Sequence, residues 1–124
     1  MSIRADGLRI AAALTALGFC AGVAHAQGAD QMQKLAKAGV QFSANNARVA
    51  SEVCGVDAST VADYKRAASR KFAQDADFAK DWDAGWAHAA QTVDGLRQMK
   101  AGSPDEYAQQ KSAICSDMRQ QMKS

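Results

Sequence analysis

The stretch from Ala76 to Met99, ADFAKDWDAGWAHAAQTVDGLRQM, decides the fold of this chain. Its apolar and small residues recur at steps of three and four, which places them on one stripe of an α-helix. The stripe consists of Phe78, Trp82, Gly85, Ala89, Val93, Leu96 and Met99. Both tryptophans of the chain fall in this stretch. We therefore expect a long central helix whose stripe the other helical segments cover.

A second helical pattern runs from Asp30, a good N-cap, to Cys54. Its seam has a period of 3.5 residues, which suits helices packed at a shallow angle. The seam consists of Met32, Leu35, Gly39, Phe42, Asn46, Val49 and Val53. Asn46 is polar, and the sequence leaves open whether it makes a buried hydrogen bond or marks a solvated end of the seam. Gly55 is expected to end this helix in the left-handed conformation.

Two shorter helical segments flank the central one. The first takes Asp57, Ser59 or Thr60 as its N-cap and ends near Gln74. Its stripe consists of Val61, Tyr64, Ala68 and Phe72. The second starts at the stretch 103–106, SPDE, where an N-cap serine precedes a proline at the first helical position. Its face consists of Tyr107, Lys111, Ile114, Met118 and Met122, with Cys115 at the edge.

The chain contains one proline and no run of alternating β-branched residues. Four helices with short turns predict an all-α fold, a small antiparallel four-helix bundle. Alanine and glycine fill many seam positions, so the core buries little apolar area. A small domain with such a core needs a covalent cross-link. Cys54 and Cys115 are expected to form one disulfide, which would contribute about 4 kcal/mol to stability in the chain-entropy model.

The first 26 residues have the pattern of a secretory signal peptide. Positive charge at Arg4 and Arg9 precedes a short apolar run, and Ala24-His25-Ala26 fits a cleavage site. We expect cleavage after Ala26, which leaves residues 27–124 as one helical domain in the periplasm. Cys20 is expected to be removed with the signal and not lipidated, because the bulky Phe19 precedes it.

The residues that carry chemistry are sparse. His88 is the one histidine beyond residue 26, whereas transition-metal sites usually take two or more His or Cys ligands. Haem ligation by His88 and a methionine is the alternative, with no CxxCH motif to attach the haem. The candidate methionines are Met32, Met99, Met118 and Met122. Neither cofactor nor catalysis is expected.

Acidic residues gather near the start of the central helix. Asp75 is the expected N-cap of this helix. The positive end of the helix dipole would stabilise the nearest carboxylates, and the others, including Asp81, are expected to be solvated. Across the whole chain, 15 Lys and Arg stand against 13 Asp and Glu, which leaves a net charge of +2. This balance argues against a dedicated nucleic-acid-binding protein.

The sequence is therefore interpreted as an exported, non-enzymatic binding protein. An inhibitor or immunity protein and an envelope stress chaperone are the candidate roles, and a haem or metal carrier is the alternative. The partner is expected to be a protein of the cell envelope or a secreted enzyme, with a second copy of the chain as a further candidate. Trp86 at the edge of the stripe, together with Arg66 and Arg70 on one helix face, forms the predicted partner-binding set.

Overall fold

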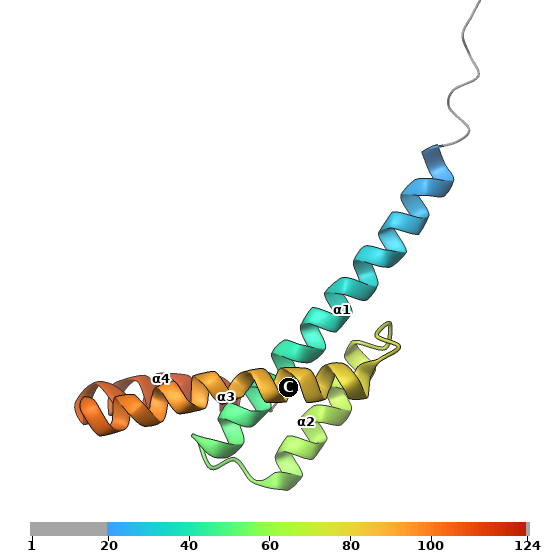
Figure 1. Ribbon diagram of the computed structural model, residues 1–124. Helices are drawn as coiled ribbons and strands as arrows, with labels where there is room; N and C mark the ends of the chain where they lie inside the picture. Colours follow the sequence, from blue (N-terminus) through green and yellow to red (C-terminus); the bar gives the residue numbers. More distant parts are fainter. Residues whose placement is uncertain (1–19, 124) are drawn as a thin grey trace, which may run out of the picture.

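The computed structural model describes the backbone of residues 20–123 and the side chains of residues 28–123. This part of the chain is all-helical, with α1 (Cys20–Glu52), α2 (Ala58–Lys71), α3 (Phe78–Gly102) and α4 (Pro104–Gln121) (Figure 1). No strand occurs among the described residues. The predicted all-α fold and its helical bundle are confirmed.

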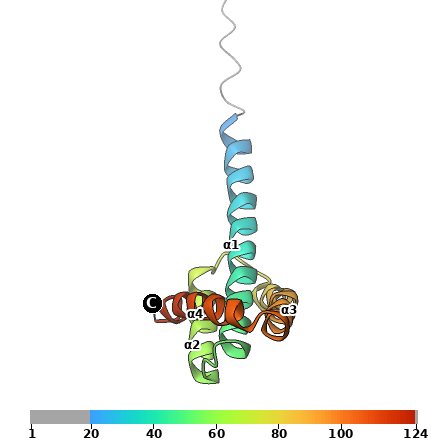
Figure 2. The ribbon, with the colours of Figure 1, turned by 90° about the vertical axis from the view of Figure 1, so that its left-hand side faces the viewer.

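The four helices form two antiparallel hairpins, α1 with α2 and α3 with α4, and these hairpins cross (Figure 1). In Figure 2, α1 stands upright, α3 is seen nearly end-on beside its lower part, and α4 runs across the view at the same level. The shallow packing angle expected for α1 is therefore wrong for its contact with α3. The N-terminal end of α1 extends beyond the other three helices.

The core lies where the two hairpins cross. Its buried centre consists of Val40, Ala44, Ala47, Ala68 and Trp82. Half-buried Phe72, Phe78 and Met122 pack around this cluster, together with residues of α2 and α3. The predicted stripe of α3 is confirmed, because Trp82, Gly85 and the positions that follow it on the stripe up to Leu96 are buried.

The termini of the helices differ in part from the prediction. α1 continues through Asp30, which is therefore not its N-cap, and includes the position after Ala26 where cleavage is expected. Residues 1–19 of the predicted signal peptide lie outside the described residues, so cleavage stays a prediction. Asp57 is the N-cap of α2, and Gly55 has a φ of 66°, as expected. Asp77, and not Asp75, precedes α3.

The disulfide between Cys54 and Cys115 is confirmed, with a Cα–Cα distance of 5.4 Å. It joins the chain just after α1 to the middle of α4, and both cysteines are buried. Cys115 was expected at the edge of the α4 face and lies instead at its most buried position. The bridge thus holds the α3–α4 hairpin against the end of the α1–α2 hairpin.

Candidate binding surface

An apolar stretch of α1 is exposed to solvent. Leu35 is 69% exposed, Phe42 64% and Met32 55%, and Ala38 between them is exposed as well. We call these four residues the α1 face. Met32, Leu35 and Phe42 were predicted to lie in a buried seam, and that prediction is wrong for these three residues. The buried side of α1 consists of the smaller residues Ala36, Val40, Ala44 and Ala47.

The same seam is covered further along α1. Asn46 is buried and donates a hydrogen bond from Nδ2 to Oε1 of Gln121, at 3.0 Å. Val49, one turn later, is also buried. α4 ends at Gln121. The seam is therefore buried at Asn46 and exposed at Phe42, and the question left open for Asn46 is answered by a buried hydrogen bond.

A shallow hollow of about 530 Å³ adjoins the α1 face where α1 and α3 cross. Its lining includes Ala38 and Phe42 from α1, and Gly85 and His88 from α3. The side chains of Gln41 and Asn45 complete it. Amide and imidazole groups at the rim of an apolar surface can hydrogen-bond a partner while its apolar side chains are buried. The hollow thus extends the α1 face towards α3.

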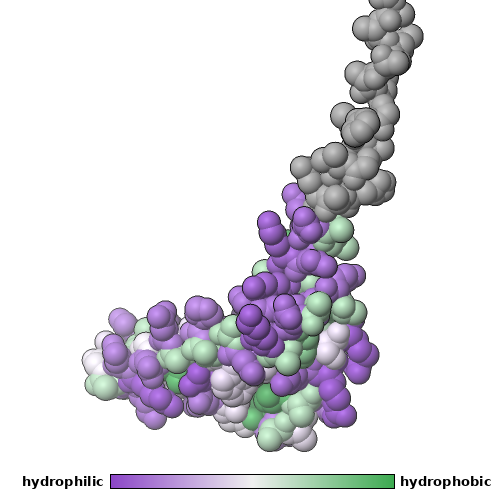
Figure 3. Space-filling view, turned by 45° about the vertical axis from the view of Figure 1, so that its right-hand side comes forward, coloured by the Kyte–Doolittle hydropathy of each residue, from purple (hydrophilic) through white to green (hydrophobic). Residues whose placement is uncertain are grey.

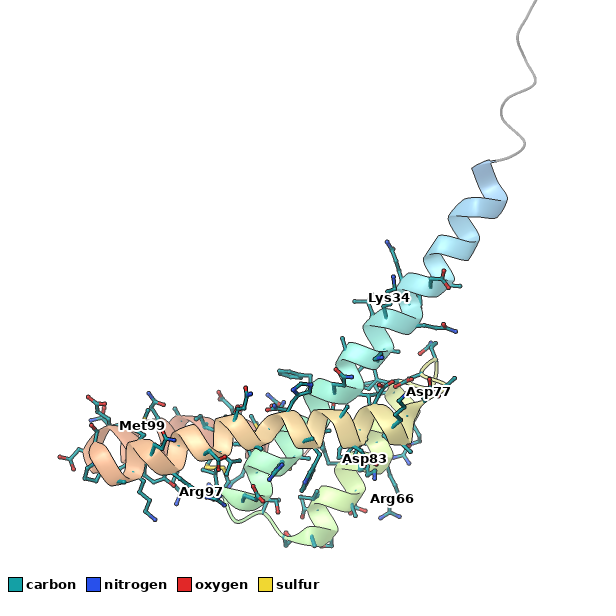
Figure 4. The ribbon with its side chains drawn as sticks, in the orientation of Figure 1. Lys34, Arg66, Asp77, Asp83, Arg97 and Met99 are labelled. Carbon is teal, nitrogen blue, oxygen red and sulfur yellow. A yellow bond between two sulfur atoms is a disulfide. The ribbon has the colours of Figure 1, made fainter. Side chains whose placement is uncertain are left out.

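The charges of this half of α1 lie on a different side of the helix. Asp30, Lys34 and Lys37 line a groove with the α2–α3 connection, residues 74–77. Figure 4 shows Lys34 on the extended part of α1 and Asp77 near the start of α3. In the space-filling view of Figure 3, hydrophilic and hydrophobic residues alternate over the helical body. The α1 face itself carries no charged residue.

Asp81 departs from the solvated position expected for it. It is buried, and its Oδ1 lies 3.6 Å from Nζ of Lys37. The same oxygen accepts a hydrogen bond from Nε2 of Gln41, at 3.4 Å. A buried carboxylate needs such partners to offset its lost hydration. Asp81 therefore ties α3 to α1 and holds the Lys37 side chain away from the α1 face.

The predicted partner-binding residues lie on two helices. Trp86 of α3 is half-buried against the core, and its carbonyl accepts a hydrogen bond from Nη1 of Arg48, at 2.9 Å. Arg66 and Arg70 are exposed on α2, and Arg66 forms an ion pair with Asp63 (Figure 4). The structure records no contact between Trp86 and either arginine, so the three do not form one cluster. Their role in binding stays a prediction.

The groups considered for cofactor binding are dispersed. His88 is exposed on α3, and Met32 is exposed on α1. Met99 lies half-buried on α3, whereas Met118 is half-buried on α4 and Met122 directly follows that helix. Among the residues that the structure describes, no group of three or more His, Cys, Asp or Glu side chains is arranged to hold a metal ion.

Comparisons with known proteins found no matching family model, no matching curated protein and no matching solved structure. Within the described part of the chain, no helix is both long enough and apolar enough to cross a membrane. The α1 face was missed from the sequence because its spacing is that of a buried seam. Ala36, Val40, Ala44 and Ala47 recur at steps of four and three on the roughly opposite side of the helix, and this recurrence was the signal that a second, smaller face competes for burial.

Proposed function

We propose that this protein is an exported, non-enzymatic binding protein of the periplasm that recognises a partner protein through the α1 face. The observation that carries the proposal is the exposure of Leu35, Phe42 and Met32 on one side of α1, although the opposite side of the same stretch is packed against the rest of the fold. Large apolar side chains that share one exposed face are typical of interaction sites.

The chemistry of the face favours an apolar partner surface. Burial of apolar area contributes about 25 cal/mol per Å², so Leu35 and Phe42 would supply most of the binding free energy. An amphipathic helix commonly binds by laying such a face into a groove or against another helix. The amides of Gln41 and Asn45 and the imidazole of His88, at the neighbouring hollow, would add hydrogen bonds to the partner.

Two roles fit a surface of this kind in the cell envelope. An inhibitor or immunity protein would use it on one secreted enzyme, whereas an envelope stress chaperone would use it on many partly unfolded clients. Either role requires binding alone and no catalytic group. The number of partners distinguishes the two roles.

The test is site-specific photocrosslinking in the host cell. A photoreactive amino acid is placed at Leu35 or Phe42, and at Gln110 on the exposed side of α4 as the control. We expect crosslinks to other envelope proteins from the two α1 positions and none from Gln110. Mass spectrometry of the products counts the partners. Absence of α1 crosslinks, or a haem Soret band in the purified protein, would contradict the proposal.

Export is tested separately by the intact mass of the periplasmic protein. Cleavage after Ala26 should leave Gln27 as the first residue. A lipid-modified Cys20 at the new N-terminus would overturn this expectation. Recovery of the full-length chain from the cytoplasm would overturn the proposed location as well.

A further inference from the structure

We propose that the cleft between α1 and α2 binds a small aromatic acid. The cleft has a volume of about 350 Å³ and is lined by residues of both helices, by Phe72 at the end of α2 and by Gln121 at the end of α4. Small-molecule sites have volumes of about 300–1,000 Å³, so the cleft suits a ligand at the small end of this range. Its lining shares no residue with the α1 face. The inference therefore goes beyond the proposed partner binding and does not rest on it.

Ser43 places a buried hydroxyl in the wall of the cleft. This residue of α1 is 7% exposed and lines the cleft. A serine within a helix commonly donates to a backbone carbonyl of the preceding turn, as Ser69 donates to the carbonyl of Arg66. Among the described residues, Ser43 has no such partner. A buried hydroxyl without a partner is costly, and it can both donate and accept, so a polar atom of a ligand would relieve that cost.

Two aromatic side chains bound the cleft along α2. Tyr64 and Phe72 are eight positions apart, which separates them by about 12 Å along the helix axis. Ala67 and Ala68 lie between them, and their small side chains leave this space open. A Cβ added at Gly39 would overlap the Phe72 ring, so the glycine lets this ring lie directly against α1. The space suits one ring of a ligand, because aromatic rings pack favourably edge to face or offset.

The charge of the cleft favours an acidic ligand. Lys71 is the one charged residue in its lining, and Nζ of Lys71 lies 5.6 Å from the centroid of the Phe72 ring. Lys71 is also exposed, which places its ammonium group at the mouth of the cleft. A carboxylate on the ligand would form a charge-assisted hydrogen bond with this group, whereas a cationic ligand would be repelled by it.

One ligand can meet all of these requirements. Its carboxylate would lie at the mouth beside Lys71, its ring between Tyr64 and Phe72, and a polar group on the far side of the ring would reach Ser43. The compound para-hydroxyphenylacetate carries these groups in this order and serves as the probe. Its few atoms limit the affinity, so we expect a dissociation constant of about 1 mM.

The experiment is an NMR titration of the oxidised protein, as recovered after export, with para-hydroxyphenylacetate up to about 10 mM. We expect saturable shifts of the backbone amides that border the cleft, including those of Ser43, Ala67 and Ala68. Tyramine, which carries an ammonium group in place of the carboxylate, should bind at least about tenfold more weakly. Absence of saturable shifts at the cleft, or equal binding of tyramine, would overturn the inference.

Two substitutions assign the contacts. Lys71→Gln should weaken binding of para-hydroxyphenylacetate at least about threefold, whereas Lys80→Gln on α3, which removes the same charge outside the cleft, should not. Phenylacetate lacks the ring hydroxyl and should bind the wild type at least about threefold more weakly than the probe does. Ser43→Ala should abolish this preference, and Ser69→Ala should keep it. Both variants of the cleft should retain the helical circular dichroism of the wild type. A preference that survives in Ser43→Ala, or unchanged binding by Lys71→Gln, would refute the assigned site.

Discussion

Gly85 of α3 meets the backbone of Gln41 of α1 at the crossing of the two hairpins. A Cβ added at Gly85 would lie 2.6 Å from the Cα of Gln41 and would overlap its carbonyl oxygen. No side chain can rotate away to relieve such a contact, because the obstructing atoms are backbone. The crossing of α1 and α3 therefore depends on a residue without a side chain at this position.

Gly85→Ala is predicted to destabilise the protein strongly. The two helices would have to separate at their closest point, and overpacking of this kind costs about 1–3 kcal/mol or more. Urea unfolding followed by circular dichroism measures the change in the free energy of unfolding.

Gly95→Ala on the same helix is the matched control. Gly95 is exposed, and a Cβ there would meet no atom within 4 Å. Alanine should raise helix propensity and stabilise the protein by up to about 1 kcal/mol. Equal effects of the two substitutions would show that α1 and α3 do not touch at Gly85.

Loss of the disulfide is predicted to lower stability substantially. The bridge spans 61 positions of the sequence, and closing a loop of that length contributes about 4 kcal/mol in the chain-entropy model. We expect the Cys54→Ser, Cys115→Ser double variant to unfold at a markedly lower urea concentration than the oxidised wild type. Thiol titration of the denatured, unreduced wild type should find no free thiol in residues 27–124. Two free thiols would contradict the bridge.

Asp57 provides the predicted pH dependence. Hydrogen bonds from the Ser59 hydroxyl, then from the hydroxyl and backbone N–H of Thr60, lower the pKa of Asp57 from 3.8 to about 2. A carboxyl whose pKa is lower in the folded state stabilises the fold above its unfolded pKa. That contribution is lost as the pH falls from about 4 through about 2. Asp57→Asn keeps a good N-cap that does not titrate, so its stability should fall less steeply over this range.

The pKa itself is measured by carboxyl NMR titration. Ser59→Ala should raise the pKa of Asp57 towards 3.8, because it removes the strongest of these donors. Ser69→Ala is the control, since its hydroxyl donates to the carbonyl of Arg66 and not to Asp57. An Asp57 pKa that is the same in all three proteins would show that Ser59 does not stabilise the carboxylate.

The sequence predicted α3 well because its stripe mixes large and small residues at one unambiguous period. Its large side chains Trp82, Val93 and Leu96 all lie on this one stripe, and all three are buried. The turn at Gly55 was also predictable, because glycine adopts the observed left-handed conformation without strain.

The direction of α1 was harder to predict because two of its faces compete. The seam with Leu35 and Phe42 is more apolar, yet Val40 and Ala44 on the smaller face are the residues that are buried. Alanine has a small side chain that contributes little apolar area, so a row of alanines predicts less clearly than leucine or phenylalanine which face packs. The steep crossing at Gly85 then allows α3 to cover only a short length of α1. Periodicity within one helix carries no information about the length that its neighbours cover.

The two tryptophans of α3 are predicted to differ in their contribution to the fold. Trp82 is 4% exposed, with its ring centroid 5.9 Å from that of Phe78 and with Nζ of Lys65 lying 5.3 Å from its ring centroid. Trp86 is only half-buried at the edge of the same core. Trp82→Ala should therefore cost about 3–5 kcal/mol, close to the whole stability of a small domain. Trp86→Ala should cost less than about 2 kcal/mol and keep the helical circular dichroism.

The same pair of variants separates folding from binding. If Trp86 contacts a partner, Trp86→Ala should stay folded and lose the crosslinks formed from Phe42 in the host cell. Crosslinks that persist would place binding on the α1 face without Trp86, and the Arg66 and Arg70 surface of α2 would then be tested by the same substitution to glutamine. Unfolding of Trp86→Ala as complete as that of Trp82→Ala would show that Trp86 belongs to the core, because truncation of a large core side chain is among the substitutions that destabilise most.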